Sequence, residues 1–176
     1  MKERGFTIVE LLVVIIVMAI LLTLAVVNVR STQANARDDE RIVDVENVSL
    51  ALESFYASNH GGVFTKSYPG TLEFNNDLVM NFIKERTGES SLRAPGVDSD
   101  SPISFVIATN NNTPTTGLSP MPTITTYVYQ PLTSNGTLCP ISDGPCQRFN
   151  IYYRLEKATD DCPAPENICT YKSKNQ

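Results

Sequence analysis

The most prominent feature of the hydrophobic pattern is an uninterrupted apolar run near the N-terminus. Residues 11–29 contain no Asp, Glu, Lys or Arg, and their only polar members are Thr23 and Asn28. About 20 residues of this kind in a helix span the roughly 30 Å hydrocarbon layer of a bilayer. The pattern therefore predicts a membrane-spanning helix.

After this run the pattern becomes amphipathic. Five apolar residues recur every three or four positions, the spacing that aligns them on one helix face: Ile42, Val45, Val48, Leu52 and Phe55. Four charged residues fall mostly on other faces: Arg41, Asp44, Glu46 and Glu53. No Gly or Pro occurs between Phe6 and Gly61, so we predict one helix over residues 6–58, on the order of 80 Å long at about 1.5 Å per residue. His60, Gly61 and Gly62 mark its end.

The rest of the chain indicates one short helix and several strands. Asn76 or Asp77 can cap a helix over residues 77–87, with Gly88 at its end and an apolar face of Leu78, Val79, Phe82 and Ile83. Four strand-like runs follow, at residues 103–108, 124–130, 149–156 and 168–172. In the third, Phe149, Ile151, Tyr153 and Leu155 alternate with polar residues, which predicts one buried and one solvated face. The expected fold class is α+β, a long N-terminal helix packed on a small antiparallel sheet.

A carboxylate, Glu10, stands at the edge of the apolar run and needs an explanation. A charged side chain in a membrane-spanning segment is costly and usually has a partner or a function. Lys2 and Arg4 precede it and favour a cytoplasmic N-terminus, with the remainder of the chain facing outward. Glu10 could also extend its carboxylate to the lipid headgroups, because it lies close to the helix start.

The stretch Lys2-Glu3-Arg4-Gly5-Phe6-Thr7-Ile8-Val9-Glu10-Leu11-Leu12 resembles the processing signal of type IV pilins and of type II secretion pseudopilins. The resemblance implies that a prepilin peptidase cuts between Gly5 and Phe6 and that Phe6 is then N-methylated. It also implies a pilin-like fold in which residues 1–5 are a leader and residues 6–29 are the membrane and filament-core helix. Residues 30–58 are then the amphipathic helix, and residues 59–176 a globular head with an αβ-loop and a C-terminal sheet.

Assembly is the function that this resemblance implies. The chain would be a structural subunit of an extracellular pilus-like filament, with other pilin subunits and inner-membrane assembly machinery as partners. Removal of the leader exposes an ammonium at Phe6, one helical turn from Glu10, and a neighbouring subunit's ammonium is equally available to this carboxylate. The precursor is expected in the cytoplasmic membrane with a single span, and the assembled head outside the cell. Many relatives have a helix-breaking Gly or Pro in the anchor, and this chain has neither.

Other interpretations stay open. Ala34-Asn35-Ala36 has the small-residue pattern of a secretory cleavage site, and the helix could be an ordinary anchor. The protein could also be a pseudopilin of a type II secretion system. A further alternative is a membrane-tethered binding domain that does not polymerise and contacts partners through the Thr- and Asn-rich loop at residues 109–122.

Four cysteines lie in the last 40 residues, in two C-x6-C units. Outside the cytoplasm we expect them to be oxidised. Short loops favour Cys139 with Cys146 and Cys162 with Cys169, while a nested pairing of Cys139 with Cys169 and Cys146 with Cys162 remains open. Zinc is disfavoured, because structural zinc pairs are usually closer in sequence.

The sequence lacks the signals of an enzyme. It has one histidine, His60, and no nucleophile elbow, phosphate-binding loop or zinc-protease motif. No cofactor is expected. The net charge of −5 and scattered basic residues do not support nucleic-acid binding. Asp98 and Asp100 are weak calcium candidates, because they lack the glycine framework of a calcium loop.

Overall fold

Helix α1 (Ile8–Ala57) is the long helix that the sequence predicts. The computed structural model describes residues 7–58, 66–140 and 144–175. The chain divides into two units, residues 1–36 and 37–176, and α1 contributes to both. The predicted leader at residues 1–5 and the helix end at residues 59–62 lie outside the described residues.

The second unit contains a four-stranded sheet in the order β1-β2-β3-β4. The strands are β1 (Phe105–Ile107), β2 (Tyr127–Leu132), β3 (Arg148–Arg154) and β4 (Ile168–Lys172). Pairs β2–β3 and β3–β4 are antiparallel, as expected, but β1 pairs with β2 in parallel, so the sheet is mixed. Parallel neighbours need a connection of a dozen or more residues, which residues 108–126 supply. The α+β class is confirmed.

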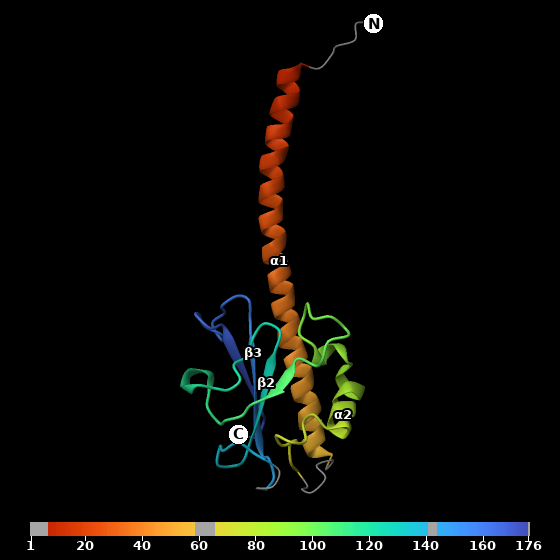
Figure 1. The fold of residues 1–176 in the computed structure, drawn as a ribbon, viewed down its shortest axis with the longest axis vertical. Helices are drawn as coiled ribbons and strands as arrows, with labels where there is room; N and C mark the ends of the chain where they lie inside the picture. Colours follow the sequence, from red (N-terminus) through yellow and green to blue (C-terminus); the bar gives the residue numbers. More distant parts are fainter. Residues whose placement is uncertain (1–6, 59–65, 141–143, 176) are drawn as a thin grey trace. The chain divides into compact units, whose positions relative to one another are not determined.

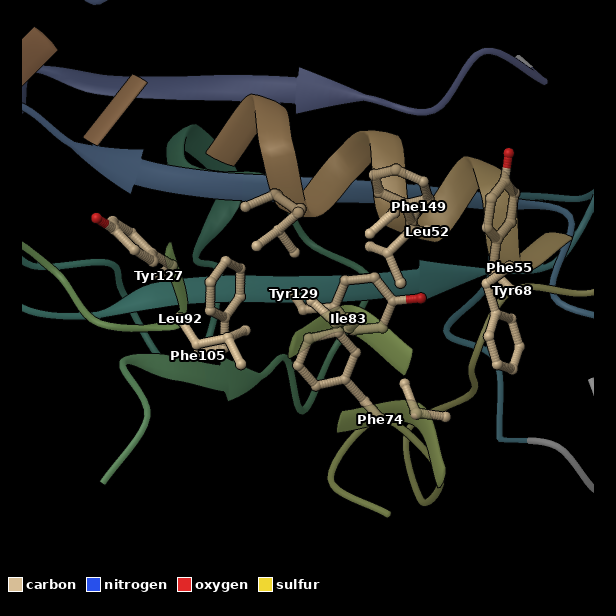
Figure 2. Close-up of a cluster of buried hydrophobic side chains, with 14 of the residues drawn as sticks. Leu52, Phe55, Tyr68, Phe74, Ile83, Leu92, Phe105, Tyr127, Tyr129 and Phe149 are labelled. Atoms are coloured by element: carbon tan, nitrogen blue, oxygen red, sulfur yellow. The ribbon is translucent and has the colours of Figure 1, made fainter. Parts of the chain in front are cut away.

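The main core lies between the sheet and two helices of this unit. Figure 1 shows the C-terminal part of α1 with β2 and β3 on one side and α2 (Asp77–Thr87) on the other. Figure 2 shows the aromatic side chains that fill this space, among them Phe74, Tyr129 and Phe149. Phe55 of α1 meets Phe82 of α2 edge to face at 5.2 Å between ring centroids. Leu52, Ile83 and Ile151 are fully buried in the same cluster.

Helix α2 has the bounds and caps that the sequence indicates. The Asn76 side chain accepts a hydrogen bond from the backbone N–H of Leu78, and Gly88 ends the helix at a φ of 82°, a conformation that suits glycine. The predicted apolar face is wrong at one position. Leu78 is 55% exposed, and Met80 is buried in the core. Two short 3-10 helices follow, η1 (Ser90–Leu92) and η2 (Pro114–Thr116).

The second face of the sheet is not the solvated surface that the alternation in β3 predicts. Tyr152 is only 2% exposed and packs with Val128, Ala108 and Leu118 in a second apolar cluster. Leu118 belongs to the loop at residues 109–122, and the Gln130 amide donates hydrogen bonds to backbone carbonyls of that loop. The loop therefore packs on the sheet through part of its length.

Candidate functional site

The N-terminal part of α1 is an apolar surface that no other described part of the chain covers. Every described side chain from Thr7 to Leu24 is exposed, for example 62% at Leu11 and 68% at Leu22. The Thr23 hydroxyl donates to the Ile20 carbonyl at 2.7 Å, which satisfies it within the helix. The helix is long and apolar enough to cross a membrane. Such a surface needs lipid or other apolar helices around it.

Glu10 closes the first turn of this helix. Its Oε2 accepts hydrogen bonds from the backbone N–H of Thr7 at 2.9 Å and from the Thr7 hydroxyl at 2.8 Å. The Thr7 hydroxyl in turn accepts from the backbone N–H of Glu10 at 3.2 Å. This reciprocal arrangement is a capping box, in which Thr7 is the N-cap and Glu10 the third helical residue. The Thr-x-x-Glu spacing is the sequence signal of this cap, which the prediction of a pairing role for Glu10 does not include.

The other predicted residues of the signal are not described. Gly5 and Phe6 lie outside the described residues, so the pairing of Glu10 with an N-terminal ammonium stays a prediction. Both hydrogen bonds to the Glu10 carboxylate use Oε2, and none reaches Oε1 among the described residues. The capping box thus leaves one carboxylate oxygen open to a further donor.

A buried ion cluster lies where α1 enters the second unit. Arg41 is 1% exposed, and its Nη1 donates to Asp38 Oδ1 at 2.9 Å and to Glu156 Oε1 at 3.1 Å. Its Nε donates to the carbonyl of Ile124 at 3.0 Å. Arg41 therefore links α1 to the segment before β2 and to the segment after β3.

The cluster is completed by a second arginine and by backbone donors. Arg37 binds both oxygens of Glu156 at 2.7 Å, a bidentate geometry. Asp38 also accepts from the backbone N–H groups of Glu156 and Lys157, at 2.8 and 3.1 Å. The Arg37 guanidinium, followed by that of Arg41, lowers the pKa of Glu156 to about 2 despite its partial burial.

The sequence interpretation placed Arg41 and Asp44 mostly away from the apolar face, and that is wrong. Both are buried, at 1% and 7% exposure. Asp38 and Arg41 continue the same three-and-four spacing that joins Val45 to Phe55. An oppositely charged pair three residues apart on that stripe was the available signal. Glu156, which also binds Arg41, lies 115 residues away in the sequence, so the spacing along the helix does not identify it as a partner.

Asp44 is the least satisfied carboxylate of the buried face. Its Oδ2 and the hydroxyl of Tyr127 have no hydrogen-bond partner among the described residues. Burial raises the pKa of Asp44 to about 6; a hydrogen bond from Ser91 opposes this effect, and the Glu40 carboxylate adds to it. The folded state thus binds a proton at Asp44 more tightly than the unfolded chain does.

We expect Asp44→Asn to stabilise the second unit at neutral pH by about 1–2 kcal/mol, because the neutral amide removes the burial of a charge. In the parent protein the stabilising contribution of Asp44 is complete below pH 4 and is lost as the pH rises from about 4 to about 6. The measurement is denaturant unfolding of the full chain in detergent at pH 5 and pH 8. The gain should be larger at pH 8.

Asp39→Asn is the matched control, because Asp39 is exposed on the same helix. It removes the same charge without changing a buried group. An equal gain from both substitutions at pH 8 would show that net charge, rather than burial, sets the effect.

The cysteines form two local disulfides, Cys139–Cys146 and Cys162–Cys169. This is the pairing that the short loops favour, and the nested pairing and a four-cysteine zinc site do not occur. Asp98 and Asp100 are exposed in a turn closed by the Ser101 N–H and the Asp98 carbonyl. In the described ranges no three His, Cys, Asp or Glu side chains are grouped to hold a metal.

Comparison with known proteins bears on the N-terminal segment. Residues 1–26 match the family model described as the prokaryotic N-terminal methylation motif. The chain carries a type IV pilin-like signal. This match confirms the resemblance of residues 2–12 to a pilin-type signal. Together with the apolar helix α1, the signal fits a membrane-anchored precursor.

A relative extends the similarity beyond the pilin-like signal. Over 78 residues the chain is 32% identical to the type II secretion system core protein G of Escherichia coli (strain K12). The match covers 44% of this chain and 50% of the relative, so the chain spans about half the length of that protein. No solved structure matches the chain.

Proposed function

We propose that the chain is a structural subunit of an extracellular pilus-like filament, made as a membrane-anchored precursor. The observation that carries the proposal is the exposed apolar surface of α1, which begins at a pilin-like signal. Lipid covers this surface before assembly, and the same surface of neighbouring copies covers it afterwards. A prepilin peptidase and inner-membrane assembly machinery are the partners that this route requires.

Glu10 specifies the register between copies in this proposal. One copy's carboxylate keeps its Thr7 cap through Oε2 and receives the Phe6 ammonium of a neighbour at Oε1. Two opposite charges that meet among apolar helices reduce each other's desolvation cost, whereas a displaced register leaves both unpaired. The pair therefore favours a single stagger of the helices.

A type II secretion pseudopilin is the second candidate, and the similarity to core protein G favours it. Both candidates use the same signal, the same helix and the same assembly step. They differ in the partner machinery. A tethered domain that does not polymerise is the third alternative.

Processing separates assembly from the tethered alternative. We expect mass spectrometry of the protein from envelope fractions to find a mature N-terminus at Phe6, with the mass of one added methyl group. Gly5→Ile should leave the precursor uncut, because the peptidase must accommodate the residue before the cut. An intact Met1 terminus, or a terminus after Ala36, in the parent protein would contradict the proposal.

A further inference from the structure

The sheet face away from α1 carries a groove of about 780 Å³, a size typical of ligand-binding pockets. We call it the outer-face groove. Its floor is formed by outward residues of two adjacent strands: Arg148, Asn150 and Tyr152 of β3, and Ile168, Thr170 and Lys172 of β4. Its walls are two loops that each present proline, at residues 113–115 and 163–166.

The two ends of the outer-face groove differ in chemistry. Lys172 pairs in register with Asn150, and Arg148 lies next to this pair, so both cations stand at one end. Neither has a salt bridge among the described residues. Ile168, the proline loop and Glu166 line the other end, and Arg154, which pairs with Ile168, does not line the groove. The cationic end is therefore complementary to a carboxylate.

The shape of the groove favours an extended chain as the occupant. From Ile168 to Lys172 the floor advances four residues along β4, about 14 Å at about 3.4 Å per residue. An extended peptide of four or five residues has this length. Proline rings offer apolar contact without a backbone N–H that would need a partner. Thr170 is exposed and places a hydroxyl on the floor between these walls.

A hydrogen-bond network supports the floor of the outer-face groove. The Asn150 amide donates to Gln130 Oε1 and to the Tyr152 hydroxyl, both at 3.0 Å, and Tyr152 donates to Gln130 Oε1 at 3.0 Å. Gln130 is 1% exposed and holds the loop at residues 110–112 through two further hydrogen bonds. The position of the floor and of one wall is therefore fixed by a single network.

We propose that the outer-face groove binds an extended peptide segment of another protein. The bound segment has an acidic residue over Arg148 and Lys172 and apolar side chains beside Ile168 and Pro163. The site belongs to the second unit alone and lies on the sheet face opposite the one that packs on α1. The proposal therefore holds whether the chain is a filament subunit or a tethered domain.

The test is fluorescence anisotropy with the full chain in detergent micelles. The probes are fluorescein-labelled hexapeptide amides: Leu-Thr-Val-Thr-Asp-Glu, its reverse sequence, and Leu-Thr-Val-Thr-Asn-Gln as the neutral match. We expect one acidic orientation to bind at least tenfold more tightly than the neutral peptide, and the difference to shrink at high salt. Equal binding of the acidic and neutral peptides, or no saturable binding of either acidic orientation, would overturn the proposal.

Three variants locate the binding. Arg148→Gln with Lys172→Gln should weaken the acidic peptide at least tenfold and leave the neutral peptide unchanged. Arg86→Gln is the matched control, because Arg86 is exposed on α2, on the other side of α1 from the sheet (Figure 1). Thr170→Trp fills the floor and should weaken every peptide while the unfolding temperature stays near that of the parent.

Two further outcomes would reject the peptide groove. In the first, Arg86→Gln weakens binding as much as the double variant, which indicates attraction by overall charge. In the second, oligogalacturonate binds with the same dependence on Arg148 and Lys172 while the peptides do not, which indicates an acidic saccharide site.

Discussion

We expect Arg41→Met to lower the free energy of unfolding of the second unit by about 3–5 kcal/mol, a large part of the 5–15 kcal/mol typical of a domain. The substitution preserves most of the apolar volume but removes the charge that Asp38 and Glu156 share. It also leaves the Ile124 carbonyl without its donor. Denaturant unfolding of the full chain in detergent, followed by a signal from the tyrosines of the second unit, measures the loss.

Arg37→Met is the matched control for this loss. Arg37 binds the same Glu156 carboxylate at 2.7 Å, but its side chain is 38% exposed and solvent can replace the lost contact. Its effect should be clearly smaller. Equal effects of the two substitutions would mean that contact with Glu156, rather than burial of the Arg41 charge, determines the cost.

The ion cluster also makes the free energy of unfolding depend on pH. The lowered pKa of Glu156 means that its stabilising contribution is complete above pH 4.5 and is lost as the pH falls toward 2. In Glu156→Gln this acid dependence should be reduced. The raised pKa of Asp44 acts in the opposite direction between about pH 4 and 6, so the parent protein should be most stable at mildly acidic pH.

Local signals in the sequence predicted the elements well, because each element carries its own periodicity and caps. Helix α2 begins at Asp77 and ends at Thr87, as the Asn76 cap and Gly88 indicate. Strand β4 has the predicted bounds, whereas β1, β2 and β3 differ from the predicted bounds by one to three residues at each end. These features depend on residues that are neighbours in sequence.

The features that were missed depend on residues far apart in sequence. Parallel pairing of β1 with β2 is decided by the path of residues 108–126, which contain no hairpin signal. Tyr152 is buried because the loop carrying Leu118 returns over the sheet. Arg41 is buried because Glu156 and Ile124 come from distant segments. The alternation and the charge of these residues are visible in the sequence, whereas their surroundings depend on the fold.

The proposed assembly site is a different case, because the motif predicts one role of Glu10 and the structure adds a second. The sequence predicts that Glu10 pairs with an ammonium, and the structure shows it in a capping box with Thr7. The two roles are compatible, because the cap uses Oε2. They nevertheless complicate the obvious experiment, since Glu10→Ala removes the cap and the charge together.

We therefore expect the decisive result from Glu10→Gln, which keeps a capping side chain but removes the charge. Fibres recovered by shearing or from envelope fractions should fall at least tenfold, as they should in Glu10→Ala. The processed subunit should still accumulate in the membrane, because a neutral side chain inserts more readily than a charged one. Immunoblots of the fibre and membrane fractions measure both quantities.

Thr7→Val separates the two roles, because it removes the capping hydroxyl and leaves the Glu10 carboxylate. If the charge specifies the register, Thr7→Val should give fibres in nearly normal amounts. If the cap is what assembly needs, Thr7→Val should lose fibres while Glu10→Gln keeps them, and the pairing role would be rejected. The comparison distinguishes a requirement for the N-terminal cap of α1 from a requirement for an ion pair between subunits. Only the ion pair depends on the charge of Glu10.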